Sequence, residues 1–174
     1  MHKICIAFFD IKKQHQELDE LQKLYPNIKI LKGIEIGYKP SELDRINNII
    51  KDNHFDLINL SLHESDRIDY YFKEEFFKLG IKETLSIYFQ RQLEAIENFH
   101  DYDVFCHLDY GFKTAYLADN NVNIQDYEEI ITKIMKALIK EEKALEINIK
   151  VQDVLPVEHT QYLLRLYKKF NLIK

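Results

Sequence analysis

The stretch Val104-Phe105-Cys106-His107-Leu108-Asp109 sets the interpretation of the whole chain. An apolar run leads into a histidine, and a carboxylate follows two residues later. This pattern is typical of a short buried strand whose carboxyl end delivers polar side chains to one place. Ile30-Leu31-Lys32-Gly33-Ile34-Glu35 and Leu57-Ile58-Asn59-Leu60-Ser61-Leu62-His63 have the same form. We therefore expect the fold to bring Glu35, His63 and His107 together.

Outward from these stretches, strand and helix patterns alternate along the chain. Runs of β-branched and aromatic residues predict strands over 2–9, 28–36, 56–62, 103–108 and 144–149. Apolar residues at helical spacing predict helices over 11–25, from Pro40-Ser41 onward with Ser41 as N-cap, and over 84–99, 123–143 and 158–170. The charged segment 66–79 is expected to be a loop with a short helix. This order predicts βαβ units and an α/β fold with a parallel sheet.

Composition and charge exclude several classes of protein. The 174 residues fit one domain, and 46% hydrophobic with 30% charged residues is ordinary for a globular chain. A net charge of −5 argues against a nucleic-acid partner held by its backbone. No apolar run approaches the roughly 20 residues that span a bilayer, and the first residues lack the pattern of a signal peptide. We expect a cytoplasmic protein with no membrane partner, in which Cys5 and Cys106 are reduced core thiols.

Glu35, His63 and His107 are candidate metal ligands. Polar groups at the carboxyl ends of parallel strands meet at one face, and strands about 4.8 Å apart let three side chains share a centre. Two histidines and a glutamate are a common ligand set for catalytic zinc, and manganese or iron accepts the same donors. Taken singly, each histidine could be a hydrogen-bonded structural residue, and Glu35 could be an ion-pair partner of a helix. The joint pattern favours a divalent transition metal, which would be zinc, manganese or iron.

Several segments also resemble the motifs of a known family. Gly33-Ile34-Glu35, Leu60-Ser61-Leu62-His63 and Cys106-His107-Leu108-Asp109 resemble motifs of the polymerase-and-histidinol-phosphatase (PHP) superfamily. Their order and spacing resemble its histidinol-phosphatase branch most closely. Ala144-Leu145-Glu146-Ile147-Asn148 looks like the later Glu-Ile-Asn strand of that branch. The resemblance covers the chain from about residue 16 to residue 174.

The resemblance implies a distorted (β/α)₇ barrel, similar to a TIM barrel, whose metal centre hydrolyses a phosphate monoester, as in histidine biosynthesis. It implies that Glu35 bridges metals and that His63 and His107 share one metal with it. The family holds substrate phosphate with a basic residue just beyond His-x-Asp, and by position Lys113 is the nearest candidate. A solvent-facing lysine is an equally simple interpretation of Lys113. Asp109 is expected to orient a ligand or the nucleophilic water, or else to cap the following turn.

The sequence departs from the family pattern at both ends. The first family motif, His-x-His, occurs nowhere in this chain, and the last, Gly-Ser-Asp-x-His, is absent where the chain stops at Asn171-Leu172-Ile173-Lys174. We therefore expect a single PHP-like domain over 1–174, truncated at both ends, with a partial barrel and one complete metal position. Exposed strand edges pair readily with other chains. A homo-oligomer is expected to cover them, unless residues 2–9 close one edge.

Three functional hypotheses follow from these patterns. The first is a metal-dependent phosphatase resembling histidinol-phosphatase, in which metal-bound hydroxide attacks a phosphorylated small molecule and the missing motifs leave activity weak or absent. The second is a degenerate, non-catalytic PHP fragment that acts as a metal-binding or interaction module. The third is an unrelated metal-dependent barrel of the sugar isomerase type, which would act on sugars without releasing phosphate.

Overall fold

The computed structural model describes residues 10–65 and 67–170. Its central element is a sheet of four parallel strands in the order β1-β2-β5-β6. These strands are Gly33–Gly37, Leu57–Ser61, Val104–Phe105 and Ala144–Leu145. The prediction of an α/β fold with a parallel sheet is confirmed. Across the part of the chain that is described, the sheet is open, with β1 and β6 at its edges. The predicted strand over 2–9 lies outside the described residues.

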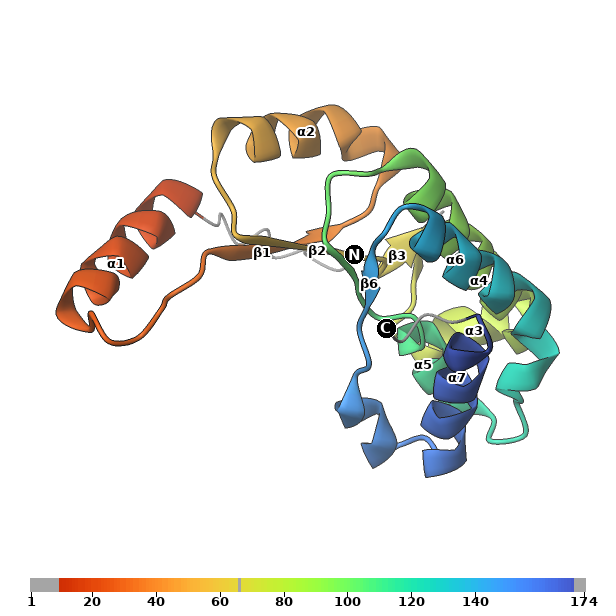
Figure 1. The fold of residues 1–174 in the computed structure, drawn as a ribbon. Coiled ribbons are helices and arrows are strands. Elements are labelled where there is room, and N and C mark those ends of the chain that lie inside the picture. The colour runs from red at the N-terminus through yellow and green to blue at the C-terminus, as the bar shows by residue number, and fades with distance from the viewer. Residues whose placement is uncertain (1–9, 66, 171–174) are drawn as a thin grey trace.

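Helices connect the strands and cover one side of the sheet (Figure 1). Figure 1 shows α2, α4 and α6 along the sheet, α5 and α7 below α4 and α6, and α1 standing apart. The α-helices are α1 (Ile11–Leu24), α2 (Leu43–Asp52), α3 (Lys73–Leu79), α4 (Ile81–Asn98), α5 (Tyr110–Ala118), α6 (Glu128–Lys140) and α7 (Val157–Lys169). Short 3₁₀ helices are η1 (Pro40–Glu42), η2 (Ile124–Tyr127) and η3 (Ile149–Asp153), and an antiparallel hairpin joins β3 (Glu64–Ser65) to β4 (Ile68–Asp69).

The alternation of side chains along the strands separates a packed face from a polar one. Ile36, Leu60 and Phe105 form one row across β1, β2 and β5, and their exposed fractions are 7%, 0% and 0%. Successive side chains of a strand point to opposite faces. Glu35 and Asn59, one position earlier in the same register, therefore lie on the other face. The fold directs Glu35 away from the hydrophobic core.

The inner side of α4 confirms the helical spacing predicted from the sequence. All five residues predicted to face inward are buried: Leu85, Tyr88, Phe89, Leu93 and Ile96. They belong to one core cluster with the packed row of the sheet and with the buried side of α6. Helix α4 therefore anchors the sheet from its packed side, which leaves the opposite face available for polar side chains.

The four predicted strands that the structure describes are all shorter than predicted; the strand predicted over 56–62 is Leu57–Ser61, and the one predicted over 144–149 is Ala144–Leu145 alone. For the other two, the reason lies in local hydrogen bonds and in backbone conformation. The strand predicted over 28–36 begins only at Gly33, because the backbone N–H of Ile28 donates to Tyr25 and that of Ile30 to the side chain of Gln22. The strand predicted over 103–108 ends at Phe105. Two residues later His107 has a φ of 65°, which is incompatible with a continuing strand.

The helix boundaries need three corrections. Ser41 is not an N-cap, because it lies inside η1, and the N-cap position of α2 is taken by Glu42 without a side-chain hydrogen bond. Asn123 caps η2 by accepting from the N–H of Gln125, and α6 begins later, at Glu128. Helix α5 was not predicted. The segment predicted as a loop with a short helix contains β4 and α3, and its first residue, Asp66, is outside the described residues.

Helix α1 forms where the leucine spacing predicts it, but it has no buried residue. Leu21 and Leu24 are 42% and 68% exposed. An ion pair of 2.7 Å between Asp19 and Lys32 ties the helix to the segment that follows it. The apolar stripe of α1 is therefore only partly covered among the described residues: Leu18 is half-buried, whereas Leu21 and Leu24 are exposed. No helix in the described part of the chain is long and apolar enough to cross a membrane.

The packing of α5 against α4 predicts a difference between two glycine substitutions. A Cβ atom at Gly111 would lie 3.0 Å from the ring of Tyr88, whose exposed fraction is 0%, so the ring has no room to move. We expect Gly111→Ala to lower the free energy of unfolding by about 1–2 kcal/mol, because overpacking exceeds the gain in helix propensity. Urea denaturation measures this.

The matched control is Gly37→Ala, because nothing lies within 4 Å of a Cβ atom at Gly37. This variant should stay within about 0.5 kcal/mol of the wild-type protein. Equal unfolding midpoints for the two variants would contradict the close approach of α5 and Tyr88.

Candidate metal-binding site

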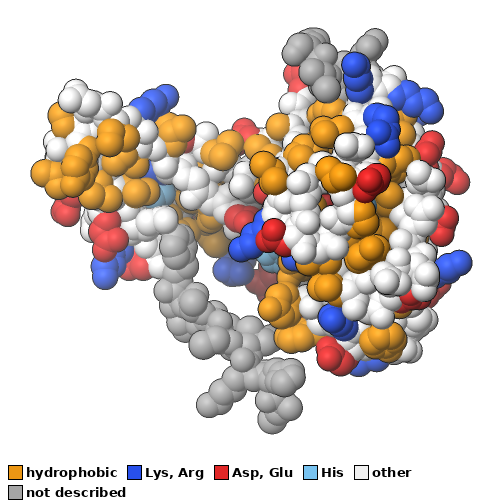
Figure 2. All heavy atoms as spheres, turned by 90° about the horizontal axis from the view of Figure 1, so that it is seen from below, with side chains coloured by type: hydrophobic (Ala, Val, Ile, Leu, Met, Phe, Trp, Pro, Cys, Tyr) orange, Lys and Arg blue, Asp and Glu red, His pale blue; other side chains and the backbone are white. Residues whose placement is uncertain are grey.

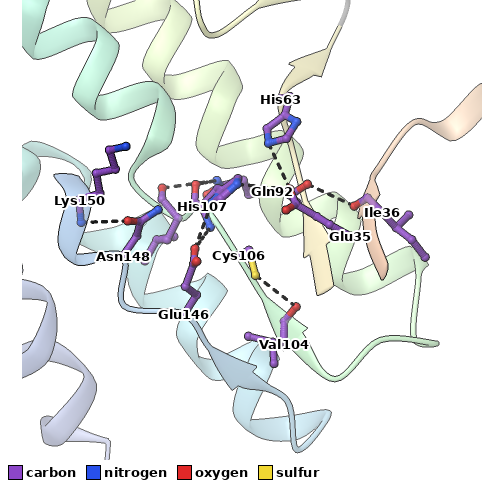
Figure 3. Close-up of polar contacts among 12 residues, drawn as sticks. Glu35, Ile36, His63, Gln92, Val104, Cys106, His107, Glu146, Asn148 and Lys150 are labelled. Carbon is purple, nitrogen blue, oxygen red and sulfur yellow. Dashed lines mark hydrogen bonds and ion pairs between the residues drawn. The ribbon is translucent and has the colours of Figure 1, made fainter. Parts of the chain in front are cut away.

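Glu35, His63 and His107 converge on the polar side of the sheet (Figure 3). Glu35 is the third residue of β1, whereas His63 follows β2 by two residues and His107 follows β5 by two. The Nε2 atoms of His63 and His107 lie 3.4 Å and 3.3 Å from the same Oε1 atom of Glu35. One donor atom from each residue lies within 4.8 Å of the other two. The structure thus brings together the three residues that the sequence singled out.

The spacing of these atoms fits a single metal ion. Donor atoms about 2.0–2.1 Å from a tetrahedral zinc ion lie about 3.3 Å apart, which matches both Glu35–histidine distances. The side chain of His107 is 18% exposed, and those of Glu35 and His63 are 40% and 46% exposed. The three residues could therefore hold one divalent ion whose remaining coordination position faces solvent. In Figure 2, histidine atoms are visible in a recess beside the larger lobe, among basic and acidic side chains.

The electrostatics of the site favour an ionised glutamate. The hydrogen bond from His107 is the main cause that holds the pKa of Glu35 at about 2. The same contact raises the pKa of His107 above its ordinary value. Burial lowers the pKa of His63, and the charge of neighbouring His107 lowers it further. Near neutral pH, Glu35 is a carboxylate and His63 is neutral, which are the forms that metal binding requires.

Glu146 orients His107, a role that the sequence reasoning missed. Its Oε2 atom accepts hydrogen bonds from the backbone N–H and from Nδ1 of His107, at 3.0 Å and 3.1 Å. With Nδ1 held by Glu146, Nε2 is the ring nitrogen that faces Glu35, where it can donate a proton to the carboxylate or, in its neutral form, offer its lone pair to a metal ion. Carboxylates recur behind metal-binding histidines for this reason. The signal was present in the Glu-Ile-Asn segment, because β6 pairs with β5 and so places Glu146 beside His107.

The main chain at His107 is held in an unusual conformation by α4. Its φ of 65° lies in the left-handed region, which residues other than glycine seldom adopt. The carbonyl oxygen of His107 accepts hydrogen bonds from the hydroxyl of Tyr88 and from Nε2 of Gln92. Both donors lie on α4 and both are fully buried. The packed helix therefore fixes the turn that directs the imidazole toward Glu35.

Asp109, predicted as a catalytic residue, lies outside this trio. It is 7% exposed, and its Oδ2 atom is 3.1 Å from Nε2 of His159 on α7. The ring of Phe112 stacks on that histidine at 5.0 Å. Asp109 occupies the N-cap position of α5, but its side chain makes no capping hydrogen bond. The side chain is therefore engaged by α7 and does not cap the turn.

Lys113, predicted to contact phosphate, lies at the border of the site. Its Nζ atom is 5.0 Å from the centre of the Tyr110 ring. That ring lies 5.3 Å from the ring of His63 and 5.6 Å from that of His107. Lys113 is half-buried. Lys113 therefore contacts Tyr110, and Tyr110 in turn contacts both histidines.

Cys106 adjoins His107 in sequence but is not suited to bind a metal. It is a free cysteine with an exposed fraction of 1%, as predicted for a core thiol. Burial, with a smaller contribution from the charge of Glu146, raises the pKa of its thiol to about 12. Metals bind the thiolate, so the protonated Cys106 is a packing residue. Cys5 lies outside the described residues.

Comparison with known proteins agrees with this geometry. The family model of the PHP domain matches residues 2–150. This chain belongs to the PHP domain family. The resemblance noted in the three strand-end motifs is thereby confirmed, and the match includes all three residues of the trio.

Similar proteins within the family are histidinol-phosphatases. The histidinol-phosphatase of Lactococcus lactis subsp. lactis (strain IL1403) is 34% identical over 146 residues, which are 83% of this chain and 54% of that protein. The probable histidinol-phosphatase of Clostridium acetobutylicum is 27% identical over 164 residues, 94% of this chain and 62% of that protein. This chain therefore spans a little over half of the length of these curated relatives.

A solved structure has the same arrangement of elements. It is the crystal structure of histidinol phosphate phosphatase from Lactococcus lactis, complexed with zinc, L-histidinol and phosphate. The superposition has a TM-score of 0.75 at 29% sequence identity, and it covers 92% of this chain and 62% of that one. The described fold therefore corresponds to 62% of that longer chain.

Proposed function

We propose that this protein is a metal-dependent phosphatase of the PHP type that acts on a phosphate monoester of the histidinol phosphate class. The observation that carries the proposal is the convergence of two histidine Nε2 atoms on one oxygen of Glu35 at tetrahedral spacing. Membership of the PHP family and similarity to histidinol-phosphatases supply the reaction class. The reaction would belong to histidine biosynthesis. A free, buried Cys106 agrees with a reducing compartment, and we place the protein in the cytoplasm.

Glu35, His63 and His107 would hold the divalent ion, which could be zinc, manganese or iron. Such an ion lowers the pKa of water and polarises a phosphoryl oxygen. Glu146 keeps the Nε2 lone pair of His107 directed at the site through its hydrogen bond to Nδ1. Lys113, placed by Tyr110, would attract the dianionic phosphate to the same edge.

Asp109 is assigned a positioning role in this proposal. Its side chain is buried in a pair with His159, so it cannot reach a substrate in solvent. The trio supplies one complete metal position, and residues 1–174 contain no His-x-His motif that could help to hold a second ion. Paired ions clamp both the attacking and the leaving oxygen in phosphoryl transfer. We therefore propose an activity well below that of a centre with a full ligand set.

A second candidate function is a metal-binding or interaction module without catalysis. The missing motifs favour it, and the intact trio is compatible with it. The same trio serves both functions, so metal binding alone does not distinguish them. Metal-dependent release of phosphate does.

The proposed metal site predicts the stoichiometry of metal binding. We expect about one zinc or manganese ion per chain, measured by equilibrium dialysis and atomic emission spectroscopy. The double variant His63→Ala, His107→Ala should bind none, because two of three donors are gone. A matched double variant, His54→Ala with His100→Ala, removes two exposed histidines outside the trio and should bind as the wild type does. A wild-type chain without metal would remove the basis of the site.

The phosphatase proposal predicts metal-dependent phosphate release from L-histidinol phosphate. Lys113→Met should lower kcat/KM by about tenfold or more, since a hydrogen bond to a charged group contributes about 1.5–3 kcal/mol. Lys133→Met is the control, because Lys133 is exposed and pairs with Glu129 on α6. Phosphate release that does not depend on added manganese or zinc, or no release at all, would favour the non-catalytic module.

The open edges of the sheet predict self-association. Unpaired strand edges recruit other strands, and β1 and β6 are both edge strands among the described residues. We propose a homo-oligomer in which neighbouring copies cover these edges. Light scattering on the purified protein at about 100 μM should give a mass at least twice the 21.0 kDa of one chain. A monomer at that concentration would contradict this.

A further inference from the structure

A small cavity lined by both apolar and polar residues lies between α7 and the segment that follows β6; its apolar lining is Leu108, Ile147 and Leu163. Its polar lining consists of Asp109, Glu146, Asn148 and Thr160. The cavity offers about 10 Å³ to the centre of a water molecule. That space is enough for one water molecule. Glu146, which lines the cavity, turns its Oε2 atom to His107, so the cavity adjoins the carboxylate that orients this histidine.

Thr160 presents a buried hydroxyl to this region without a partner. The residue is 7% exposed, and its Oγ1 atom makes no hydrogen bond to the described residues. A buried polar group left without a hydrogen bond costs about 1–3 kcal/mol. Native proteins commonly satisfy such groups with an ordered water. The unpartnered hydroxyl and the cavity are two separate observations, and both indicate a bound water molecule.

The hydrogen-bonding capacity left on the other three residues is complementary to a water molecule. Asp109 uses Oδ2 for His159, and Glu146 uses Oε2 for His107, so each carboxylate has its second oxygen left. Asn148 uses its Oδ1 atom to accept from the N–H of Lys150, which leaves its amide N–H groups. Two acceptors and two donors therefore surround the cavity, and water has two donors and two acceptors.

We propose that this cavity holds one structural water, which donates to Asp109 and Glu146 and accepts from Thr160 and Asn148. The water also separates two carboxylates that would otherwise repel each other across a small space. Its consequence is a continuous set of contacts from α7 to the site: His159 to Asp109, through the water to Glu146, and on to His107. His159 and Thr160 are thereby positioning residues for the imidazole that faces Glu35.

This inference deepens the proposed metal site and rests on it. Both positioning residues lie on α7, beyond the residues 2–150 that match the PHP family model. The family match therefore does not account for them. Outer partners of metal-binding histidines typically change metal affinity by 10–100-fold when they are removed. Thr160 is one step further from the metal site than Glu146, so its removal should lower metal affinity by about tenfold, the lower end of that range.

The test compares three threonine variants of the full chain. Thr160→Val removes the hydroxyl with little change of shape and should weaken zinc binding by about tenfold. Thr160→Ser keeps the hydroxyl and should bind zinc within about twofold of the wild type. Thr84→Val is the matched control, because Thr84 is fully buried, does not line the cavity, and donates its hydroxyl to the carbonyl of Gly80, the N-cap residue of α4. It should lose stability but keep its zinc affinity.

The water itself is tested by a crystal structure of the metal-free protein. An ordered water within hydrogen-bond distance of Glu146, Asp109 and Thr160 is expected in the wild type and in Thr160→Ser. A dry cavity would overturn the inference whatever the protein does with zinc. Equal zinc affinities for Thr160→Val and Thr160→Ser would overturn the positioning role. A wild-type chain that binds no zinc would refute the proposed metal site and, with it, the link to His107, while the crystal structure decides the water independently.

Discussion

The hydrogen bonds that hold His107 are the constraint on which the site depends. A histidine at the end of a short strand could point in several directions, and its backbone here adopts a left-handed conformation that is unfavourable outside glycine. Tyr88 and Gln92 hold the carbonyl from the packed side, and Glu146 holds the N–H and the ring from the other. The core therefore determines where Nε2 points, and this orientation is set by packing before any metal arrives.

The sheet supplies the other half of the geometry. Because register pairs Glu35 with Asn59, and because alternate side chains face opposite sides, one row of residues packs against helices while the next carries polar groups. Glu35 lies within β1 and not at its end, so the residues before and after it both pair with β2. This pairing fixes the backbone of Glu35. The two histidines come from the turns that follow the next two strands. The carboxylate of Glu35 is thus held by a strand, and the imidazoles of His63 and His107 reach it from turns.

Those parts of the site that depend on local sequence pattern could be predicted from the sequence. Apolar runs that end in Glu35, His63 and His107 indicate strand ends, and residue type indicates metal-binding capacity. Glu146 was missed because its partner lies 39 positions away, and only the pairing of β6 with β5 brings them together. The exposure of α1 was also unforeseen. Its leucine spacing is that of a helix with a packed side, but spacing says nothing about whether another element is present to pack against.

The isolation of α1 has a consequence for how the molecule moves. A helix of 14 residues with no buried side chain has little beyond its own hydrogen bonds to keep it folded. Its amide protons should exchange through local opening at a small fraction of the global unfolding free energy. The trio begins at Glu35 and is held by the core, so fraying of α1 leaves it undisturbed. Among the described residues, local order in α1 reaches the rest of the chain only through contacts of single side chains, among them the Asp19–Lys32 ion pair, the hydrogen bond between Gln22 and Ile30, and the ring contact between His15 and Phe55.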